Sequence, residues 1–581
     1  MLDFNEDIAQ KAAITVLVSL SGWWVITTYL KNRNIKKRIA NKQKECATSL
    51  SKLEGYIKEN GLSRKKQEDI LKLKFIDLYT RLQRGQLKSE DVLKAYQAKA
   101  IEKNKNLNFI VEPVWEAIPL AAVCDLEKKK GLLHGVPVSI KENYFMKGYE
   151  STGGMSPLLD KPAKEDGVLV KVLKHQGAVP FVRTNIPQSM MTFECSNPIY
   201  GTTVNPHNLK RGPGGSSGGE ACILGAEASI LGWGSDIGGS LRIPSSFCGT
   251  CSLKPTAGRL SLKTCEELDG NRVQTLIRPT PGPMGRDVDT VVMGMKAVLC
   301  PYHFKLDPDV PPLPFNTEVY ESDRKLRIGY YTNDGYVQCI PGVERAVHEA
   351  KAALEKMGHT LVPFEVPNVE KMFGEFFSKA CFGDGGQHFL DLMDNDMVDS
   401  SIQLLYYVYK LPSFMQTMLS YIASFIAKDR ILGLQMRSMQ GVKCVRDWWA
   451  LAGQIETYRK EFLLQWKSKN LDAIVCPTMP FVAPPTGTVK YLIGGVTYTT
   501  LYNVLNYPAG CVPVTKVTAV DQKNMENYPN KTGIEKFIRK YFSSDTGGLP
   551  VTVQCVALPY QEELALRVMK ELETGLKQRR K

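Results

Sequence analysis

The chain has 581 residues, of which 43% are hydrophobic and 23% are charged, and its formal net charge is +14. This length and composition are those of a globular protein with a sizeable core, built as one large domain or several ordinary ones, and they exclude a disordered chain. The basic surplus is uneven, because residues 31–105 hold 21 lysines and arginines against 9 acidic residues.

The N-terminal segment 12–30 (AAITVLVSLSGWWVITTYL) contains no charged residue. As a helix, its 19 residues would measure about 28 Å, close to the hydrocarbon thickness of a bilayer. Aromatic residues gather at one end, acidic residues precede the segment, and basic residues follow it. By the positive-inside rule, this predicts one transmembrane helix with a lumenal tail (1–11) and a cytoplasmic body. The expected location is an endomembrane such as the endoplasmic reticulum. The alternative is a buried N-terminal helix.

Residues 31–100 combine the basic surplus with apolar residues at helical spacing, as in EDILKLKFIDLYTRL. We interpret this region as solvated helices that link the anchor to a catalytic body, and its basic side chains as attracted to anionic membrane lipids. A nucleic-acid binder is the alternative, but no recognised nucleic-acid-binding motif accompanies the charge. No nucleic-acid partner is therefore predicted.

The body, residues 101–581, alternates short apolar runs with helical patterns. We expect buried strands within 134–142, 177–185 and 324–334, and a helix over 342–358 that ends at a glycine. This alternation predicts an α/β fold, with a sheet covered by helices on both faces. Cys248 and Cys251 form a lone C-x-x-C, which we interpret as core cysteines rather than a redox or zinc motif. Segment 306–316 has the PxxP spacing of an SH3 ligand, but a stiff linker is the preferred interpretation.

Two glycine-rich serine clusters lie close together, GGSSGG at 214–219 and DIGGS at 236–240. A serine nucleophile needs a base, and it needs donors for the oxyanion that develops. Backbone N–H groups around Gly238 and Gly239 suit the oxyanion of an attack by Ser240. The base is not a nearby histidine, because stretch 212–245 contains none of the seven in the chain. Lys141 closes an apolar strand, where burial favours the neutral amine, and Ser216 is available to relay the proton.

With these clusters, HGVPVSIKEN around Lys141 and GPMGRDV at 282–288, the chain resembles the amidase-signature hydrolases over about residues 100–581. The resemblance implies the amidase-signature fold, with a large twisted mixed β-sheet at its core. It also implies a Ser-Ser-Lys triad in which Ser240 is the nucleophile, Ser216 the bridging proton relay and Lys141 the base. A cis peptide at Gly215–Ser216 belongs to the same pattern.

Further site residues follow from the resemblance. The oxyanion would be held by the backbone of Ile237, Gly238, Gly239 and Ser240, and Met190 would line the substrate site through its backbone. Ser217, Asp236 and Arg242 would support these loops. The acyl-chain channel has the candidates Met191, Phe193 and Val496, with Tyr336, Phe377 and Phe382 as further ones.

Within the family, the chain is most similar to animal members that hydrolyse fatty acid amides. This implies hydrolysis of N-acylethanolamines such as anandamide, and of primary fatty amides such as oleamide, to fatty acid and amine through an acyl-enzyme. It also implies a homodimer that contacts membrane lipids and a lipid amide substrate. No cofactor and no metal are predicted, since no HExxH and no phosphate-binding glycine motif is present.

Residues 411–437 place apolar side chains at helical spacing, interrupted by Lys428 and Arg430. This pattern predicts an apolar helical hairpin that caps the catalytic body and enters the membrane interface. Two amphipathic helices that face the core are the alternative.

Two other functions remain open. One is a general amidase or an amidotransferase-type subunit of the same family, which would need no membrane anchor. The other is a catalytically silent membrane scaffold, although such a protein has no chemical need for Lys141, Ser216 and Ser240 together.

Overall fold

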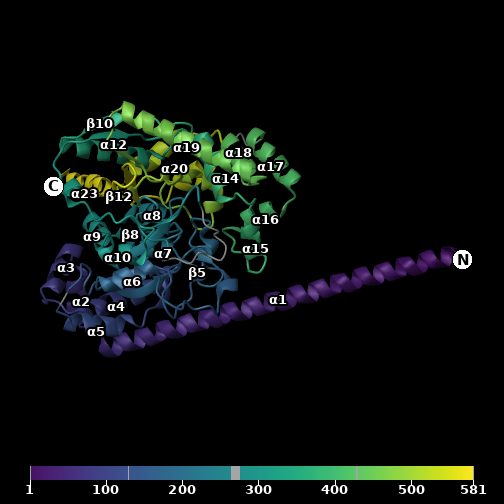
Figure 1. Cartoon of the computed structure of the whole chain (residues 1–581), viewed down its shortest axis with the longest axis horizontal. Helices are drawn as coiled ribbons and strands as arrows, with labels where there is room; N and C mark the ends of the chain where they lie inside the picture. The colour runs from purple at the N-terminus through teal and green to yellow at the C-terminus, as the bar shows by residue number, and fades with distance from the viewer. Residues whose placement is uncertain (1, 129, 264–274, 427–428, 580–581) are drawn as a thin grey trace.

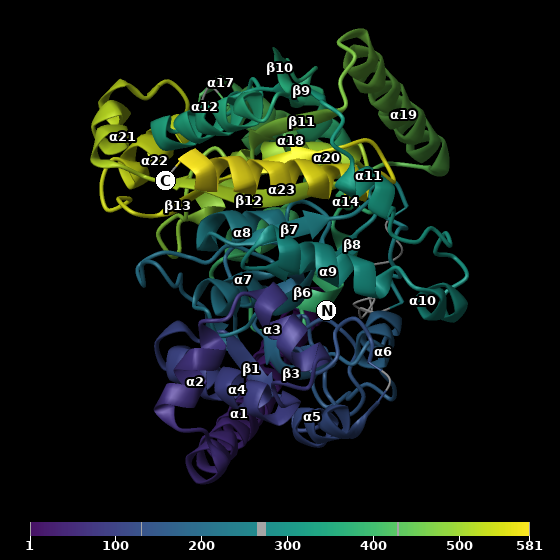
Figure 2. The ribbon, with the colours of Figure 1, turned by 90° about the vertical axis from the view of Figure 1, so that its left-hand side faces the viewer.

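A computed structural model describes residues 2–128, 130–263, 275–426 and 429–579, and gives the backbone alone for 2–30 and 579. Within these residues an 11-stranded sheet runs in the order β1-β3-β2-β6-β8-β7-β12-β13-β11-β9-β10 (Figures 1 and 2). The strands are β1 (Ile110–Pro113), β2 (Pro137–Lys141), β3 (Val179–Thr184), β6 (Leu231–Asp236), β7 (Cys251–Lys254), β8 (Thr280–Gly285), β9 (Arg327–Tyr330), β10 (Thr360–Pro363), β11 (Ala473–Pro477), β12 (Ala509–Lys516) and β13 (Pro550–Val556). β4 (Ser196–Asn197) and β5 (Gly201–Thr202) form a separate pair.

The sheet is mixed, as predicted. β2 lies parallel to both β3 and β6, and β9 lies parallel to β10 and β11, whereas the other pairings are antiparallel. Parallel neighbours end at the same edge of a sheet. The carboxyl ends of β2 and β6 therefore bring Lys141 and Asp236 to one edge.

Helices cover both faces of the sheet, which confirms the predicted α/β fold. Gly232 and Leu231 are neighbours in β6, so they point to opposite faces of the sheet. Gly232 faces α7 (Gly218–Gly225), because a Cβ at this glycine would lie 2.1 Å from the Glu220 carboxylate. Leu231 faces α9 (Val288–Val298), because a Cβ at Gly294 of that helix would meet its side chain. α8 (Arg242–Cys248) contacts α7, and α12 (Pro341–Lys356) and α23 (Glu562–Arg579) contact each other and the sheet.

The remaining helices surround this core. They are α5 (Ala117–Leu126), α6 (Val168–His175), α10 (Pro301–Leu306), α11 (Thr317–Glu321), α13 (Val369–Lys371), α14 (Ser378–Cys381), α15 (Gln387–Met393), α16 (Gln403–Lys410), α17 (Ser413–Phe425), α18 (Arg430–Ser438), α19 (Val445–Ser468), α20 (Thr497–Val504), α21 (Ala519–Asn524) and α22 (Gly533–Phe542), with a π-helical turn at Met372–Phe377. The expected helix at 342–358 is α12, and the expected strands at 134–142, 177–185 and 324–334 are β2, β3 and β9.

The N-terminal helices differ from the predicted linker. α1 (Leu2–Asn60) is one continuous helix whose first half runs out from the body (Figure 1). α2 (Arg64–Leu71) buries Ile70 in the main hydrophobic core, α3 (Phe75–Gln83) buries Phe75 and Leu78 there, and α4 (Ser89–Leu107) buries Tyr96. Their apolar residues at helical spacing form a core-facing stripe, so these helices belong to the body and are not solvated connectors.

Ion pairs hold the second half of α1 against the body of the protein. Lys42 is 6% exposed and its ammonium lies 3.6 Å from the Glu112 carboxylate and 3.1 Å from that of Glu150. Arg183 of β3 pairs with Glu112 at 2.8 Å. This buried cluster connects α1 to the strand beside β2, and therefore to the strands that carry the site.

The predicted transmembrane segment, 12–30, lies in the part of α1 whose side chains are not described. Among the residues that the structure fully describes, no helix combines the length and the apolar character needed to cross a bilayer. The span stays a prediction.

Candidate active site

Lys141 is the last residue of β2 and is completely buried. Its Nζ donates hydrogen bonds to Ser216 Oγ at 2.7 Å and to Ser235 Oγ at 2.9 Å. Two residues that the sequence analysis linked across 75 positions are therefore in direct contact. Ser235 was not among the predicted residues, although its place in β6, next to Asp236, is a signal that could have identified it.

The loop that carries Ser216 leads into α7. The Gly215–Ser216 peptide is cis, as the family resemblance implied. A Cβ at Gly215 would lie 3.0 Å from the Cα of Phe193, so the close approach of two chain segments requires glycine there. Ser217 donates its backbone N–H to the carbonyl of Ser240 at 3.1 Å. The two serine clusters are thus held side by side.

Glu220 of α7 holds this helix against strands β2 and β3 of the sheet. The hydroxyls of Ser139 in β2 and Thr184 in β3 each donate to its carboxyl group at 2.6 Å. Burial raises the pKa of Glu220 to about 8, so the carboxyl is mostly protonated at neutral pH. The bonds set the position of α7, and of Ser216 just before it, relative to β2 and Lys141.

Ser240 lies on the loop that follows β6, and its side chain is half-buried. Among the described residues, the structure gives the Ser240 hydroxyl no hydrogen-bond partner, and it does not pair this hydroxyl with that of Ser216. The backbone of Ser240 is nevertheless next to Ser217, as described above, so the loops that carry the two serine clusters are in contact.

The backbone donors around Ser240 depart from the prediction at Gly239. Its N–H donates to Asp236 Oδ1 at 2.8 Å, so it is engaged within the loop. Among the described residues, the N–H groups of Ile237, Gly238 and Ser240 have no such partner and remain available for an oxyanion. Thr499 of α20, which sequence reasoning missed, donates its hydroxyl to the Gly238 carbonyl at 2.7 Å and fixes the loop from the other side.

Gly239 also requires glycine for steric reasons. Its φ is +128°, and a Cβ there would lie 2.4 Å from the Thr499 hydroxyl. At Gly238, a Cβ would lie 3.1 Å from the ring of Phe377. Phe377, one of the candidates for the acyl channel, is therefore close to the loop that carries the nucleophile candidate.

Asp236 and Arg242 form the fully buried support of this loop. Arg242 donates to both carboxylate oxygens of Asp236 at 3.1 Å, and also to Asn503 and Gln554. Burial by itself would raise the pKa of Asp236, but the adjacent Arg242 guanidinium and the hydrogen bonds lower it to about 2. Asp236 is therefore ionised at neutral pH and acts as a structural group of the loop, as the sequence analysis expected.

We expect Asp236→Asn to lower the free energy of unfolding by about 3–5 kcal/mol at neutral pH, because it leaves the buried Arg242 without its counter-charge. The folded-state pKa lies below that of unfolded aspartate, so the stabilisation is present above about pH 4 and is lost as the pH falls toward 2. The midpoint of urea unfolding of the detergent-solubilised chain measures this loss. The exposed Asp323→Asn serves as control, and an equal shift in both variants would contradict the assignment.

The predicted substrate-lining residues are divided between two hydrophobic clusters. Met190, with a φ of +58°, and Met191 pack with Phe382 against a small cluster that includes Phe389 and Tyr409. Phe193 and Val496 belong to the main core, where Phe193 is nearly buried, edge-on to Phe247. The acyl channel that these candidates would line stays a prediction. Tyr336 also packs against the main core, and it donates its hydroxyl to Asp429 at 3.0 Å.

The cysteines of the C-x-x-C motif are core residues, as predicted. Cys248 at the end of α8 and Cys251 in β7 are both buried free thiols. The thiol of Cys248 donates to the Pro213 carbonyl at 3.4 Å, which helps to hold the serine loop.

Comparison with known proteins shows which family the chain belongs to. Residues 91–566 match the amidase family. The chain is 42% identical over 515 residues to fatty-acid amide hydrolase 1 of Sus scrofa, covering 87% of this chain and 86% of the relative. It is 37% identical over 527 residues to fatty acid amide hydrolase 1 of Caenorhabditis elegans, covering 89% and 90%.

A solved structure of a fatty acid amide hydrolase superposes with a TM-score of 0.78 at 24% identity, covering 94% of this chain and 96% of that one, which supports the fold. The sequence relatives and the family match support more than the fold, because they extend over most of the chain. The chain therefore belongs to the amidase-signature family of amide-hydrolysing enzymes.

Proposed function

We propose that the protein hydrolyses fatty acid amides, including N-acylethanolamines and primary fatty amides, to a free fatty acid and an amine. The observation that carries the chemistry is the hydrogen bond from the buried Lys141 to Ser216, beside the loop of Ser240. The substrate class rests on the names of the pig and nematode relatives. A lysine buried among hydroxyls, with no histidine in the cluster, fits a Ser-Ser-Lys triad.

In the proposed reaction, the lone pair of neutral Lys141 accepts the proton of the Ser216 hydroxyl while Ser216 accepts that of Ser240. Ser240 Oγ then attacks the amide carbonyl, and the backbone N–H groups of Ile237, Gly238 and Ser240 stabilise the oxyanion. The proton returns through Ser216 to the amide nitrogen, because an amine anion is a very poor leaving group. Water hydrolyses the acyl-enzyme by the same relay and regenerates Ser240.

The substrate preference is tested by kcat/KM for N-acylethanolamines, primary fatty amides, N-acyl amino acids and acetamide, in detergent micelles. We expect the long-chain amides to be the better substrates. A preference for acetamide would favour a general amidase instead, and no turnover of any amide would favour a silent scaffold.

We further propose that the enzyme works at a membrane, in the endoplasmic reticulum with its body in the cytoplasm and as the homodimer that the resemblance implied. α17 and α18 contact each other as a hairpin and expose apolar side chains. Phe425 and Ile426, at the end of α17, are 75% and 76% exposed. Such a surface fits insertion into the interface, where lipid amides lie. The predicted span at 12–30 would anchor the chain in the same membrane.

We expect the double variant Phe425→Glu/Ile426→Glu to lose about tenfold or more of its activity on a long-chain amide embedded in vesicles, because charged side chains oppose insertion of the hairpin. Turnover of a soluble short-chain amide should be unchanged. The full-length enzyme is assayed on both substrates, with Leu464→Glu/Val520→Glu as a control that places charges at exposed apolar positions of α19 and α21. Equal activity of the two double variants on vesicles would contradict the membrane cap.

A further inference from the structure

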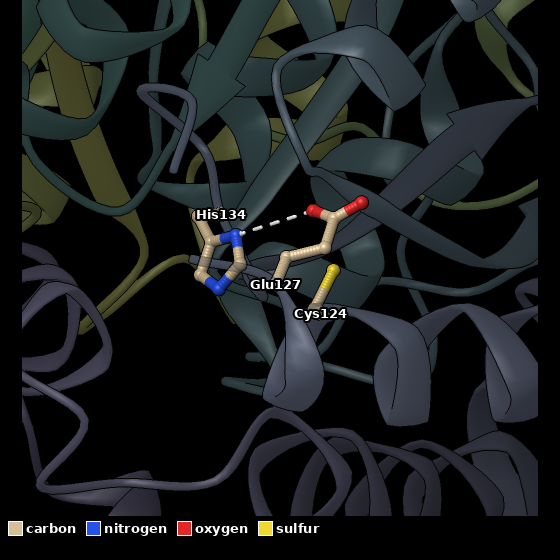
Figure 3. Close-up of side chains that lie close together, drawn as sticks. All are labelled: Cys124, Glu127 and His134. Carbon is tan, nitrogen blue, oxygen red and sulfur yellow. Dashed lines mark ion pairs between the residues drawn. The ribbon is translucent and has the colours of Figure 1, made fainter. Parts of the chain in front are cut away.

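Cys124, Glu127 and His134 form a group of metal-ligating side chains outside the active site (Figure 3). Cys124 lies in the last turn of α5, Glu127 directly follows that helix, and His134 stands in the loop before β2. The ligand atoms all lie within 4.8 Å of one another, and His134 Nδ1 faces a Glu127 carboxylate oxygen at 4.0 Å. The sequence had predicted no metal because it contains no HExxH motif.

His134 is 2% exposed, and its Nδ1 has no hydrogen-bond partner within the described residues. A buried ring nitrogen without a partner is rare and costs free energy. Figure 3 shows this nitrogen directed toward the carboxylate of Glu127, with the thiol of Cys124 beside it. In the tautomer that carries its proton on Nε2, Nδ1 therefore has a lone pair without a partner, close to a sulfur and a carboxylate.

Cys124 and His134 are held in place by the same turn. The Cys124 thiol points to the carbonyl of Gly177 at 3.6 Å, and the same carbonyl accepts the N–H of Gly135 at 2.8 Å. A Cβ at Gly177 would lie 2.7 Å from the Cα of His134, so the turn packs directly against the histidine backbone. Glu127, by contrast, has a half-exposed side chain, which is free to adjust.

We propose that Cys124, Glu127 and His134 bind a divalent transition metal ion of the zinc class. Thiolate, imidazole and carboxylate are the side chains that Zn²⁺ takes in proteins, and a water molecule would occupy the fourth position. Ligands at bonding distance from one Zn²⁺ stand about 3.3–3.8 Å apart. The separations here, 4.0 Å between His134 and Glu127 and at most 4.8 Å within the group, would have to shorten by up to about 1.5 Å when the ion binds.

Binding of the ion would release one proton and form three bonds to side chains. The Cys124 thiol releases its proton to solvent and forms a sulfur–metal bond, neutral His134 binds through Nδ1, and the Glu127 carboxylate binds through one oxygen. The two negative charges of the ligands neutralise the ion. The bound ion would connect the end of α5 to the loop that opens β2, the strand that ends at Lys141, so its effect is on stability and not on bond cleavage.

The test is a Co²⁺ titration of the full-length, detergent-solubilised chain after removal of metals by a chelator. We expect one equivalent of Co²⁺ to produce a thiolate-to-cobalt charge-transfer absorption, which Zn²⁺ then abolishes by displacement. Cys124→Ser should lose this absorption, whereas Cys444→Ser, which removes an exposed cysteine elsewhere, should keep it. Zn²⁺ should also raise the thermal unfolding midpoint of the wild type and of Cys444→Ser only.

Glu127→Gln is the second variant, because a substitution at this half-exposed residue leaves the core intact even where Cys124→Ser does not fold. We expect it to weaken Co²⁺ binding by about tenfold or more, since a neutral amide is a poor ligand for this ion. Absence of the charge-transfer absorption in the wild type, or an unchanged affinity in Glu127→Gln, would overturn the proposal. The group would then be an ordinary histidine–glutamate contact.

Discussion

Replacing Ser240 by alanine is expected to lower kcat/KM for a fatty acid amide by about 10⁴-fold or more, because the variant has no hydroxyl to form the acyl-enzyme. Labelling by a fluorophosphonate probe should disappear together with the activity. Both effects are measured on the detergent-solubilised full-length chain, by product formation and by mass spectrometry of the labelled peptide.

Ser246→Ala is the matched control for this prediction. Ser246 is a buried serine of α8 that accepts a hydrogen bond from Thr552 at 2.8 Å, on the same loop-to-helix segment but away from Lys141. It should retain labelling and activity. If Ser240→Ala were still labelled, the nucleophile would be a different residue, with Ser216 the first to be examined.

Replacing Lys141 by alanine is expected to damage amide hydrolysis more than hydrolysis of a matched ester. The amide nitrogen must receive a proton before it leaves, and the proposed relay from Lys141 through Ser216 supplies it, whereas an alkoxide leaves without full protonation. We expect a loss of about 10²–10⁴-fold on the amide and a loss at least tenfold smaller on the ester. The measurement is kcat/KM for both substrates with the same acyl chain.

Lys254→Met provides the comparison, because Lys254 is a second buried lysine. It ends β7, and its ammonium donates to the Pro255 carbonyl at 2.9 Å. Burial lowers its pKa to about 7, yet it contacts neither serine. This variant can act on the site only through the neighbouring Asp236–Arg242 pair. Any loss of kcat/KM should therefore be equal for the amide and the ester. The same equal loss in Lys141→Ala would refute the proton relay.

Several elements were predictable because their patterns are local. Segments 134–142 and 177–185 have the continuous apolar character of strands buried on both faces, and they form β2 and β3. Lys141 at the end of such a strand was expected to be buried, and it is. The pattern at 411–437 similarly predicted two helices with apolar faces, α17 and α18.

The same kind of pattern misled at residues 64–105. Apolar residues at helical spacing indicate an amphipathic helix, but they do not show what covers the apolar face. The basic composition favoured solvated connectors, whereas α3 and α4 bury Phe75, Leu78 and Tyr96 in the main core. The covering surface comes from later parts of the chain, which no local pattern contains.

The sequence by itself indicated which groups the candidate site contains: two serine clusters, a lysine at the end of a buried strand, and Asp236 and Arg242 as supports of the serine loop. Only the tertiary structure decided how they are arranged. Asn503 and Gln554 complete the hydrogen bonds of Arg242, and Thr499 holds the carbonyl of Gly238. The physical reason is that hydrogen bonds in a buried site are satisfied by whichever segments the packed sheet and helices bring together, and here these segments lie more than two hundred residues apart in the chain.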